Sequence, residues 1–267
     1  MCSSDLTFTD NFHPEVGIAA VEVLERAGYR VQMPDVHVCC GRPLYDYGML
    51  TLARRYLLRV LDVLRDDIRA GVPLVGLEPS CLAVFRDELP KMLPDDEDAK
   101  RLAKQSFHFA ELLEHDGYEP PPLGGKALLH GHCHHLATGG VGGERKLLEQ
   151  MGVEVEAPDS GCCGLAGSFG FEADHYDVSM ACGERVLLPA VREAAGDALV
   201  VADGFSCRTQ IEHGTGRRAL HVAEVLKLAQ DGALAEVPSS DGHARTAALA
   251  GGAAAALLAG LVWKARS

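Results

Sequence analysis

The stretch GYRVQMPDVHVCCG (residues 28–41) recurs, with changes, as GVEVEAPDSGCCG (residues 152–164). A segment with apolar residues at helical spacing precedes each copy, PEVGIAAVEVLERAG (residues 14–28) and GGERKLLEQMG (residues 142–152). The common unit is therefore a helix, a strand, Pro-Asp and Cys-Cys-Gly. Its recurrence predicts a chain built by internal duplication.

The copies also match further along the chain. A short apolar run that ends in a cysteine follows each pair, VPLVGLEPSC ending at Cys81 and ALVVADGFSC ending at Cys207. The next landmarks, FHFAELL (residues 107–113) and LHVAEVL (residues 220–226), each hold His-x-x-Glu. We expect these two histidines, His108 and His221, to pack against a helix or to support a ligand rather than to bind a metal directly. For Glu111 and Glu224, three residues later, we expect pairing on the helix surface.

Strands followed by helices predict an α/β fold of two Rossmann-like repeats related by a pseudo-twofold axis. The repeats are expected at residues 7–118 and 119–232, with a linker and apolar tail at 233–267. KALLHGHCHH (residues 126–135) carries Cys133 out of a strand in the second copy, whereas the first copy has almost no strand at the matching place. We therefore expect the first repeat to be truncated at its N-terminus.

Composition narrows the classes of function. The 267 residues carry a formal net charge of -13, and no basic stripe offsets it. Binding to nucleic acid or to an anionic membrane surface needs clustered Lys and Arg, so both are disfavoured. There are nine cysteines and no signal-peptide pattern at the start, which favours metal or redox chemistry in the cytoplasm over a disulfide framework.

The cysteines of the second copy form the strongest candidate site. Ligands of open α/β sheets lie beyond the carboxyl ends of the strands, where we expect these cysteines to converge. Adjacent cysteines rarely bind one zinc ion together, but two neighbouring thiolates can reach two irons of one cluster. The sequence thus predicts one [4Fe–4S] site, whose four ligands are Cys133, Cys162, Cys163 and Cys207. Cys182, inside a helical pattern, is expected to be an ordinary buried side chain.

Other readings of these residues stay open. The first copy offers only Cys39, Cys40 and Cys81, which could bind metal with His37, an aspartate or a nonprotein ligand, or could be the remains of a lost site. A structural zinc module, a thiol/disulfide reductase and a strained vicinal disulfide are the alternatives. Four histidines surround Cys133, and we expect one to hydrogen-bond a cluster sulfur while the rest are structural or solvated. They are His130, His132, His134 and His135.

The duplicated pattern resembles the cysteine-rich (CCG) domain. The stretches that carry the resemblance are CCGRPLYDYGML, GLEPSCLAVFRDELP, HGHCHH, CCGLAGSFGFE and DGFSCRTQIEHGTGRRALH, and it covers about residues 7–230. The domain occurs in FAD-linked D-lactate dehydrogenase-like proteins, in the iron–sulfur subunit of glycolate oxidase, in a subunit of anaerobic glycerol-3-phosphate dehydrogenase and, more distantly, in a subunit of heterodisulfide reductase. The resemblance is strongest to the first of these.

The resemblance implies iron–sulfur electron transfer from a flavin unit that oxidises a 2-hydroxy acid such as D-lactate or glycolate. It implies a partner that carries FAD and ferredoxin-type clusters, with membrane quinone as a candidate acceptor, and no activity of this chain alone. Heterodisulfide reductase ends each repeat in C-x-x-C, but here Glu78 and Gly204 replace the first of those cysteines. Disulfide-cleaving chemistry is therefore not expected.

The tail TAALAGGAAAALLAGLVWKARS (residues 246–267) is rich in alanine. We expect a helix over residues 247–263, which is at the short limit for crossing a bilayer. A weak anchor on the inner face of the membrane and a low-complexity appendage are both consistent with this composition.

Overall fold

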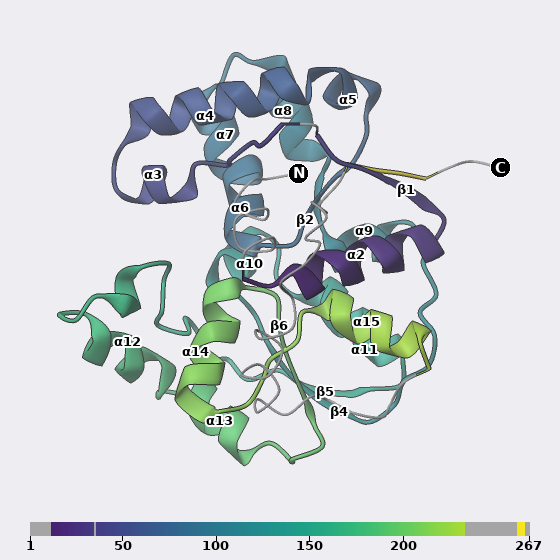
Figure 1. Ribbon diagram of the computed structural model, residues 1–267, viewed down its shortest axis with the longest axis vertical. Coiled ribbons are helices and arrows are strands. Elements are labelled where there is room, and N and C mark those ends of the chain that lie inside the picture. Colours follow the sequence, from purple (N-terminus) through teal and green to yellow (C-terminus); the bar gives the residue numbers. More distant parts are fainter. Residues whose placement is uncertain (1–11, 35, 233–260, 265–267) are drawn as a thin grey trace, which may run out of the picture. The chain divides into compact units, whose positions relative to one another are not determined.

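A computed structural model describes residues 12–34 and 36–232, together with the backbone of residues 261–264 (Figure 1). Helices and small sheets alternate along the chain, as expected for an α/β protein. The described chain divides into two compact units. The first contains residues 12–118, 134–143 and 261–264, and the second contains residues 119–133 and 144–232.

The first unit contains a four-stranded sheet in the order β1-β7-β2-β3. Its strands are β1 (Tyr29–Gln32), β7 (Leu261–Lys264), β2 (Leu74–Gly76) and β3 (Ser106–His108). β2 and β3 pair in parallel, whereas β7 runs antiparallel to both β1 and β2. A segment from the far end of the chain thus completes this sheet.

Helices surround the core of the first unit. In chain order they are α2 (Pro14–Arg26), α3 (Arg42–Asp46), α4 (Leu50–Val63), α5 (Arg65–Ala70), α6 (Pro79–Ala83), a π-helical turn (Val84–Glu88), α7 (Leu89–Met92), α8 (Glu97–Lys104), α9 (Phe109–His115) and α10 (Cys133–Thr138), whose first residue belongs to the second unit. The apolar stripe of α4 holds Ala53, Leu57 and Leu61 at helical spacing, and all three are buried. Leu57 and Leu61 pack in one cluster with Phe85.

The second unit has a parallel sheet in the order β5-β4-β6. Its strands are β4 (Lys126–His130), β5 (Glu154–Glu156) and β6 (Leu199–Ala202). An isolated parallel bridge between Val201 and Leu220 lies beside β6. Because the strands are parallel, their carboxyl ends meet at one edge, where His130 is in register with Ala202.

The helices of the second unit follow the strands. They are α11 (Gly142–Gln150), a 3-10 turn (Phe169–Phe171), α12 (Tyr176–Gly183), α13 (Leu187–Glu193), α14 (Phe205–Thr215) and α15 (Val222–Gln230). Leu187 and Val191 of α13 pack with Ile211 of α14 and with Val200 of β6 in one buried cluster. This packing holds the start of α14 at the carboxyl end of β6.

The structure changes the expectation for the tail. Residues 261–264 form strand β7, so the helix expected over 247–263 is wrong at its end. The backbone of LVWK pairs with β1 and β2, and the ladder replaces local helical hydrogen bonds. The rest of the expected tail and the expected start of the first repeat, residues 233–260 and 7–11, lie outside the described residues. Within the described ranges, no helix is both long and apolar enough to cross a bilayer.

Candidate metal centre

The parallel sheet of the second unit brings the four predicted cysteines to one edge. Cys133 is the first residue of α10, after β4, and Cys207 lies in the first turn of α14, after β6. Cys162 and Cys163 lie in the loop that follows β5. Each cysteine position thus follows the carboxyl end of a strand, as expected from the sequence.

The four sulfurs contact one another in a chain. Hydrogen bonds from Cys133 and Cys163 lower the pKa of the Cys162 thiol far below its usual range. Hydrogen bonds to Cys162 and Cys207 raise the pKa of the Cys163 thiol between them. The bond from Cys163 also lowers the pKa of the buried Cys207 thiol. A bound cation would displace protons from these sulfurs by stabilising the thiolates.

Backbone amides also point at the sulfurs. The amide of Gly164 donates to Cys162 Sγ over 3.4 Å, and the amide of Leu165 acts on Cys163. Gly164 has a φ of 97°, in the left-handed region that favours glycine. The glycine of the motif is therefore needed to turn the backbone toward the sulfurs.

His130 supports the same group of cysteines. Its Nδ1 lies 2.7 Å from the hydroxyl oxygen of Ser160, and both side chains are buried. Burial lowers the pKa of His130, but the negative charge of Cys207 outweighs that effect and raises the pKa overall. His130 is therefore bonded to Ser160, two residues before the doublet, and lies close enough to Cys207 for the two charges to interact.

His132 is the second histidine at this site. It is 7% exposed, and a ligand atom of its ring lies within 4.8 Å of Cys133 Sγ. His134 offers a ligand atom within 4.8 Å of those of His132 and Cys133, whereas His135 stacks on His108 with ring centroids 3.5 Å apart. Both His130 and His132 lie beside the cysteines, and the expectation that one of the four histidines hydrogen-bonds a cluster sulfur stays a prediction.

The first repeat shows part of the same geometry, with backbone amides that donate to the sulfurs of its Cys-Cys doublet. The amide of Gly41 donates to Cys39 Sγ and the amide of Arg42 to Cys40 Sγ, each over 3.4 Å. Cys40 and Cys81 belong to the same buried cluster. His37 is exposed. No described pair of cysteines forms a disulfide in either repeat.

A buried ion pair distinguishes the first repeat from the second. Arg42, directly after the first Cys-Cys-Gly, lies 2.8 Å from Glu88 and 3.1 Å from Asp46, and its Nε donates to the carbonyl of Ser80 over 3.1 Å. The second repeat has Leu165 at the matching place. Glu78 caps α6 by accepting from the amide of Ser80. Sequence reasoning missed Arg42, although its position next to the doublet was a signal.

The two His-x-x-Glu motifs are capping boxes. His108 and His221 are the N-caps of α9 and α15, and Glu111 and Glu224 accept from the backbone amides of these histidines. The expected supporting role of the histidines is consistent with this. Simple pairing on the helix surface is wrong for Glu224, which is buried and bonded to Arg218, whereas the side chain of Glu111 is partly exposed.

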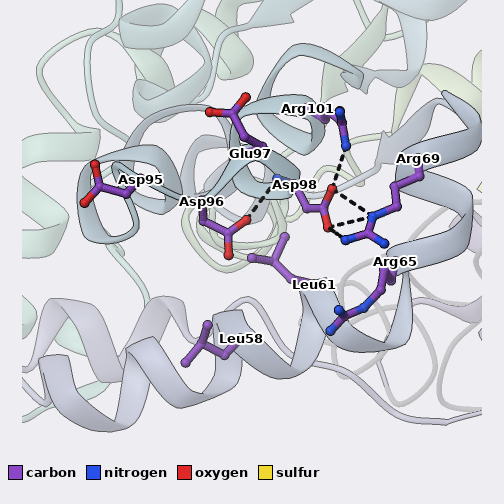
Figure 2. Close-up of a pocket in the computed structure, with 9 residues that line it drawn as sticks. All are labelled: Leu58, Leu61, Arg65, Arg69, Asp95, Asp96, Glu97, Asp98 and Arg101. Carbon is purple, nitrogen blue, oxygen red and sulfur yellow. Dashed lines mark hydrogen bonds and ion pairs between the residues drawn. The ribbon is translucent and has the colours of Figure 1, made fainter.

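A hollow of about 400 Å³ has no cysteine in its lining (Figure 2). Arg69 of α5 and Arg101 of α8 both bind Asp98, at 2.8 and 2.9 Å, and Asp96 caps α8 through the amides of residues 98 and 99. These charges satisfy one another on the surface. The hollow lies between three helices, α4, α5 and α8, and Arg69, Arg101 and Asp98 in its lining are already paired with one another.

The donor set of the second unit fits an iron–sulfur cluster. Four sulfurs come together at the edge of one sheet, two backbone amides support the doublet, and Cys163 and Cys207 are buried. Thiolate donors with amide hydrogen bonds are typical of such clusters.

Comparison with known proteins gives one family. The model of the cysteine-rich domain (CCG) matches residues 5–86 and 142–212. The chain is 32% identical over 225 residues to a subunit of the anaerobic glycerol-3-phosphate dehydrogenase of Escherichia coli, covering 82% of this chain and 56% of that protein. It is 32% identical over 233 residues to lactate utilization protein A of Bacillus subtilis, covering 81% of this chain and 94% of that protein.

A third relative is a much longer protein. Identity to D-2-hydroxyglutarate dehydrogenase of Pseudomonas putida is 28% over 223 residues, covering 82% of this chain and 21% of that protein. The chain therefore spans about half of the first relative, a fifth of the third and nearly all of lactate utilization protein A. The duplicated match and the extent of these similarities place the chain in the cysteine-rich (CCG) domain family.

Proposed function

We propose that this chain is an iron–sulfur electron-transfer component of a dehydrogenase. Cys133, Cys162, Cys163 and Cys207 would hold one cluster in the second unit. The observation that carries the proposal is the hydrogen-bonded chain of these four sulfurs at the carboxyl edge of a parallel sheet. The dehydrogenases among the relatives support an oxidoreductase role.

The protein residues have defined tasks at such a centre. A bound cluster would accept and pass on single electrons. The amides of Gly164 and Leu165 place hydrogen bonds on the doublet sulfurs, which stabilises added negative charge and raises the reduction potential. His130, held by Ser160, would place positive charge near Cys207 when protonated.

The wider assignment is also a proposal. We infer a flavin-bearing partner that oxidises a small 2-hydroxy acid, because two of the relatives are named for lactate and 2-hydroxyglutarate. Membrane quinone is the acceptor that we would test first. Thiols that must stay reduced suit the cytoplasm. We further propose two Rossmann-like repeats, 7–118 and 119–232, related by a pseudo-twofold axis and followed by a tail at 233–267.

The first repeat is proposed as a weaker site. Cys39, Cys40 and Cys81 offer three sulfurs, and the buried Arg42 supplies positive charge beside Cys40. Three thiolates beside a fixed cation would suit an anionic centre, or one completed by a ligand from outside the protein. We expect this centre to be less well organised than the four-cysteine site of the second repeat.

Anaerobic purification with iron, sulfide and zinc analysis tests the main proposal. We expect about four irons and four sulfides per second-unit site, with a visible thiolate-to-iron absorption band. Cys163→Ala should abolish the cluster. Cys182→Ala is the matched control, because Cys182 lies in the nearby helix α12 outside the chain of sulfurs, and it should keep the cluster.

Three outcomes would contradict the proposal. Colourless protein with stoichiometric zinc would indicate a structural zinc module instead. Metal-free protein whose thiols react with iodoacetamide at low pH would indicate a thiol/disulfide reductase. Equal cluster loss in both cysteine variants would refute the ligand assignment.

A further inference from the structure

His132 lies where a side chain at position 204 would otherwise lie. A Cβ built on Gly204 would be 2.3 Å from Cδ2 of His132, far inside van der Waals contact. The same Cβ would be 3.3 Å from Cys207 Sγ. The imidazole of His132 therefore occupies the space beside Cys207 that a residue at position 204 would enter.

Position 204 is a natural place for a ligand. Gly204 is the N-cap of α14, and Cys207 follows three residues later in the first turn. Residues three apart at the start of a helix lie on one face, so a side chain at 204 would point to the same centre as Cys207. The chain has glycine at this position, and the ring from the preceding strand-to-helix turn fills the space.

The imidazole also lies near the other sulfurs. A ring nitrogen and Cys133 Sγ are within 4.8 Å, which is short enough for both to bind one metal centre. The burial of His132 leaves the ring little access to solvent.

We propose that His132 supplies a nitrogen ligand to the metal centre of the second unit, in the place left by glycine at position 204. The inference rests on the proposed cluster and adds one donor to its four thiolates. The neutral imidazole donates a lone pair, so no electron or proton is consumed. A neutral imidazole leaves the charge of the four thiolates unchanged, whereas a thiolate in the same place would make the centre more negative and harder to reduce.

Pulsed electron paramagnetic resonance on the full chain tests this ligand. The protein is grown with ¹⁵N-histidine, purified anaerobically and reduced with dithionite. We expect a strongly coupled ¹⁵N nucleus in the unsubstituted chain and in His213→Ala, whose histidine is exposed on α14. The coupling should be absent in His132→Cys, which should keep its iron and show a lower reduction potential.

Gly204→Ala tests the geometry without changing the histidine. The added methyl group would displace the ring, so the nitrogen coupling should weaken or vanish while iron content stays near that of the unsubstituted chain. Coupling that persists in His132→Cys, or iron-loaded unsubstituted protein without coupling, would overturn the ligand proposal and leave the cluster proposal standing. Unsubstituted protein without iron would overturn both.

Discussion

Gly164 packs so closely against Ser179 that a Cβ on Gly164 would lie 2.0 Å from the carbonyl oxygen of Ser179. The contact presses the turn after the Cys-Cys doublet onto helix α12. Gly170 lies against the same residue, where a Cβ would be 2.3 Å from Ser179 Oγ. The glycines after the doublet therefore serve two purposes, orientation of amides toward sulfur and close approach of a helix.

This contact predicts different costs for the same substitution in the two repeats. Gly164→Ala adds a backbone clash to a left-handed φ and should lower the free energy of unfolding by about 3 kcal/mol or more. Gly41→Ala has the same kind of φ, but its Cβ would meet only ordinary contacts of 3.5 Å, so about 1 kcal/mol is expected.

Urea unfolding of the metal-free chain measures both effects. Gly167→Ala is the control inside the second repeat, since its φ is positive and a Cβ there would have open space. It should behave like Gly41→Ala. A Gly164→Ala cost no larger than that of the control would mean that the packing against α12 is not rigid.

The two capping boxes predict a second asymmetry. The side chain of Glu224 is 10% exposed and pairs with Arg218, whereas the side chain of Glu111 is 42% exposed and pairs with Arg86. Glu224→Gln would remove the carboxylate of a pair in which both side chains are largely buried and should cost about 3 kcal/mol. Glu111→Gln should cost about 1 kcal/mol or less, because water reaches Glu111 and Arg86 keeps its hydrogen bonds to the carbonyl oxygen of Ser106.

Thermal unfolding of the two glutamine variants compares these costs. Glutamine keeps an oxygen that can accept from the histidine amide, so the capping hydrogen bond survives in both. Equal losses in the two variants would show that the ion pair contributes little and that the cap alone stabilises these helices.

How far the sequence predicted this molecule depends on the range of each interaction. The doublets and their spacing predicted the strand ends and the convergence of Cys133 and Cys207 with Cys162, because alternation of strand and helix is local. Glu224 was misassigned because one-turn spacing fits both a surface pair and a capping box, and only burial separates them. The contact of His132 with Gly204 could not be predicted from the sequence, because a glycine does not indicate which side chain occupies the space beside it.

Tyr29 predicts a loss of stability in alkali. Burial, and then the 2.7 Å hydrogen bond to Asp116, raise the pKa of the Tyr29 phenol above its usual value of 10.0. A folded-state pKa above the unfolded one stabilises the fold fully below about pH 10, and this contribution falls as pH rises above it, by up to about 1.4 kcal/mol per pH unit.

Tyr29→Phe isolates this effect. The difference in unfolding free energy between the unsubstituted chain and Tyr29→Phe should be constant from pH 7 to about 9 and should shrink above about pH 10. Tyr176→Phe, at an exposed position, is the matched control and should show no such change. A difference in unfolding free energy that does not change with pH for Tyr29→Phe would contradict the raised pKa of the Tyr29 phenol.

Strand β7 makes the last prediction, because it is the least expected part of the fold. It pairs with β1 over four residues, from Tyr29 opposite Lys264 to Gln32 opposite Leu261, but with β2 at Leu74 alone. β2 keeps its parallel ladder with β3 independently of the tail. A chain that ends after residue 260 should therefore lose amide protection in β1 and keep it in β2 and β3, as measured by hydrogen exchange. Val262→Pro in the full chain places a proline in the middle of this ladder, opposite Val31, and should give a partial loss in the same strand. Undiminished protection of β1 in the shortened chain would mean that another segment pairs with this strand in solution.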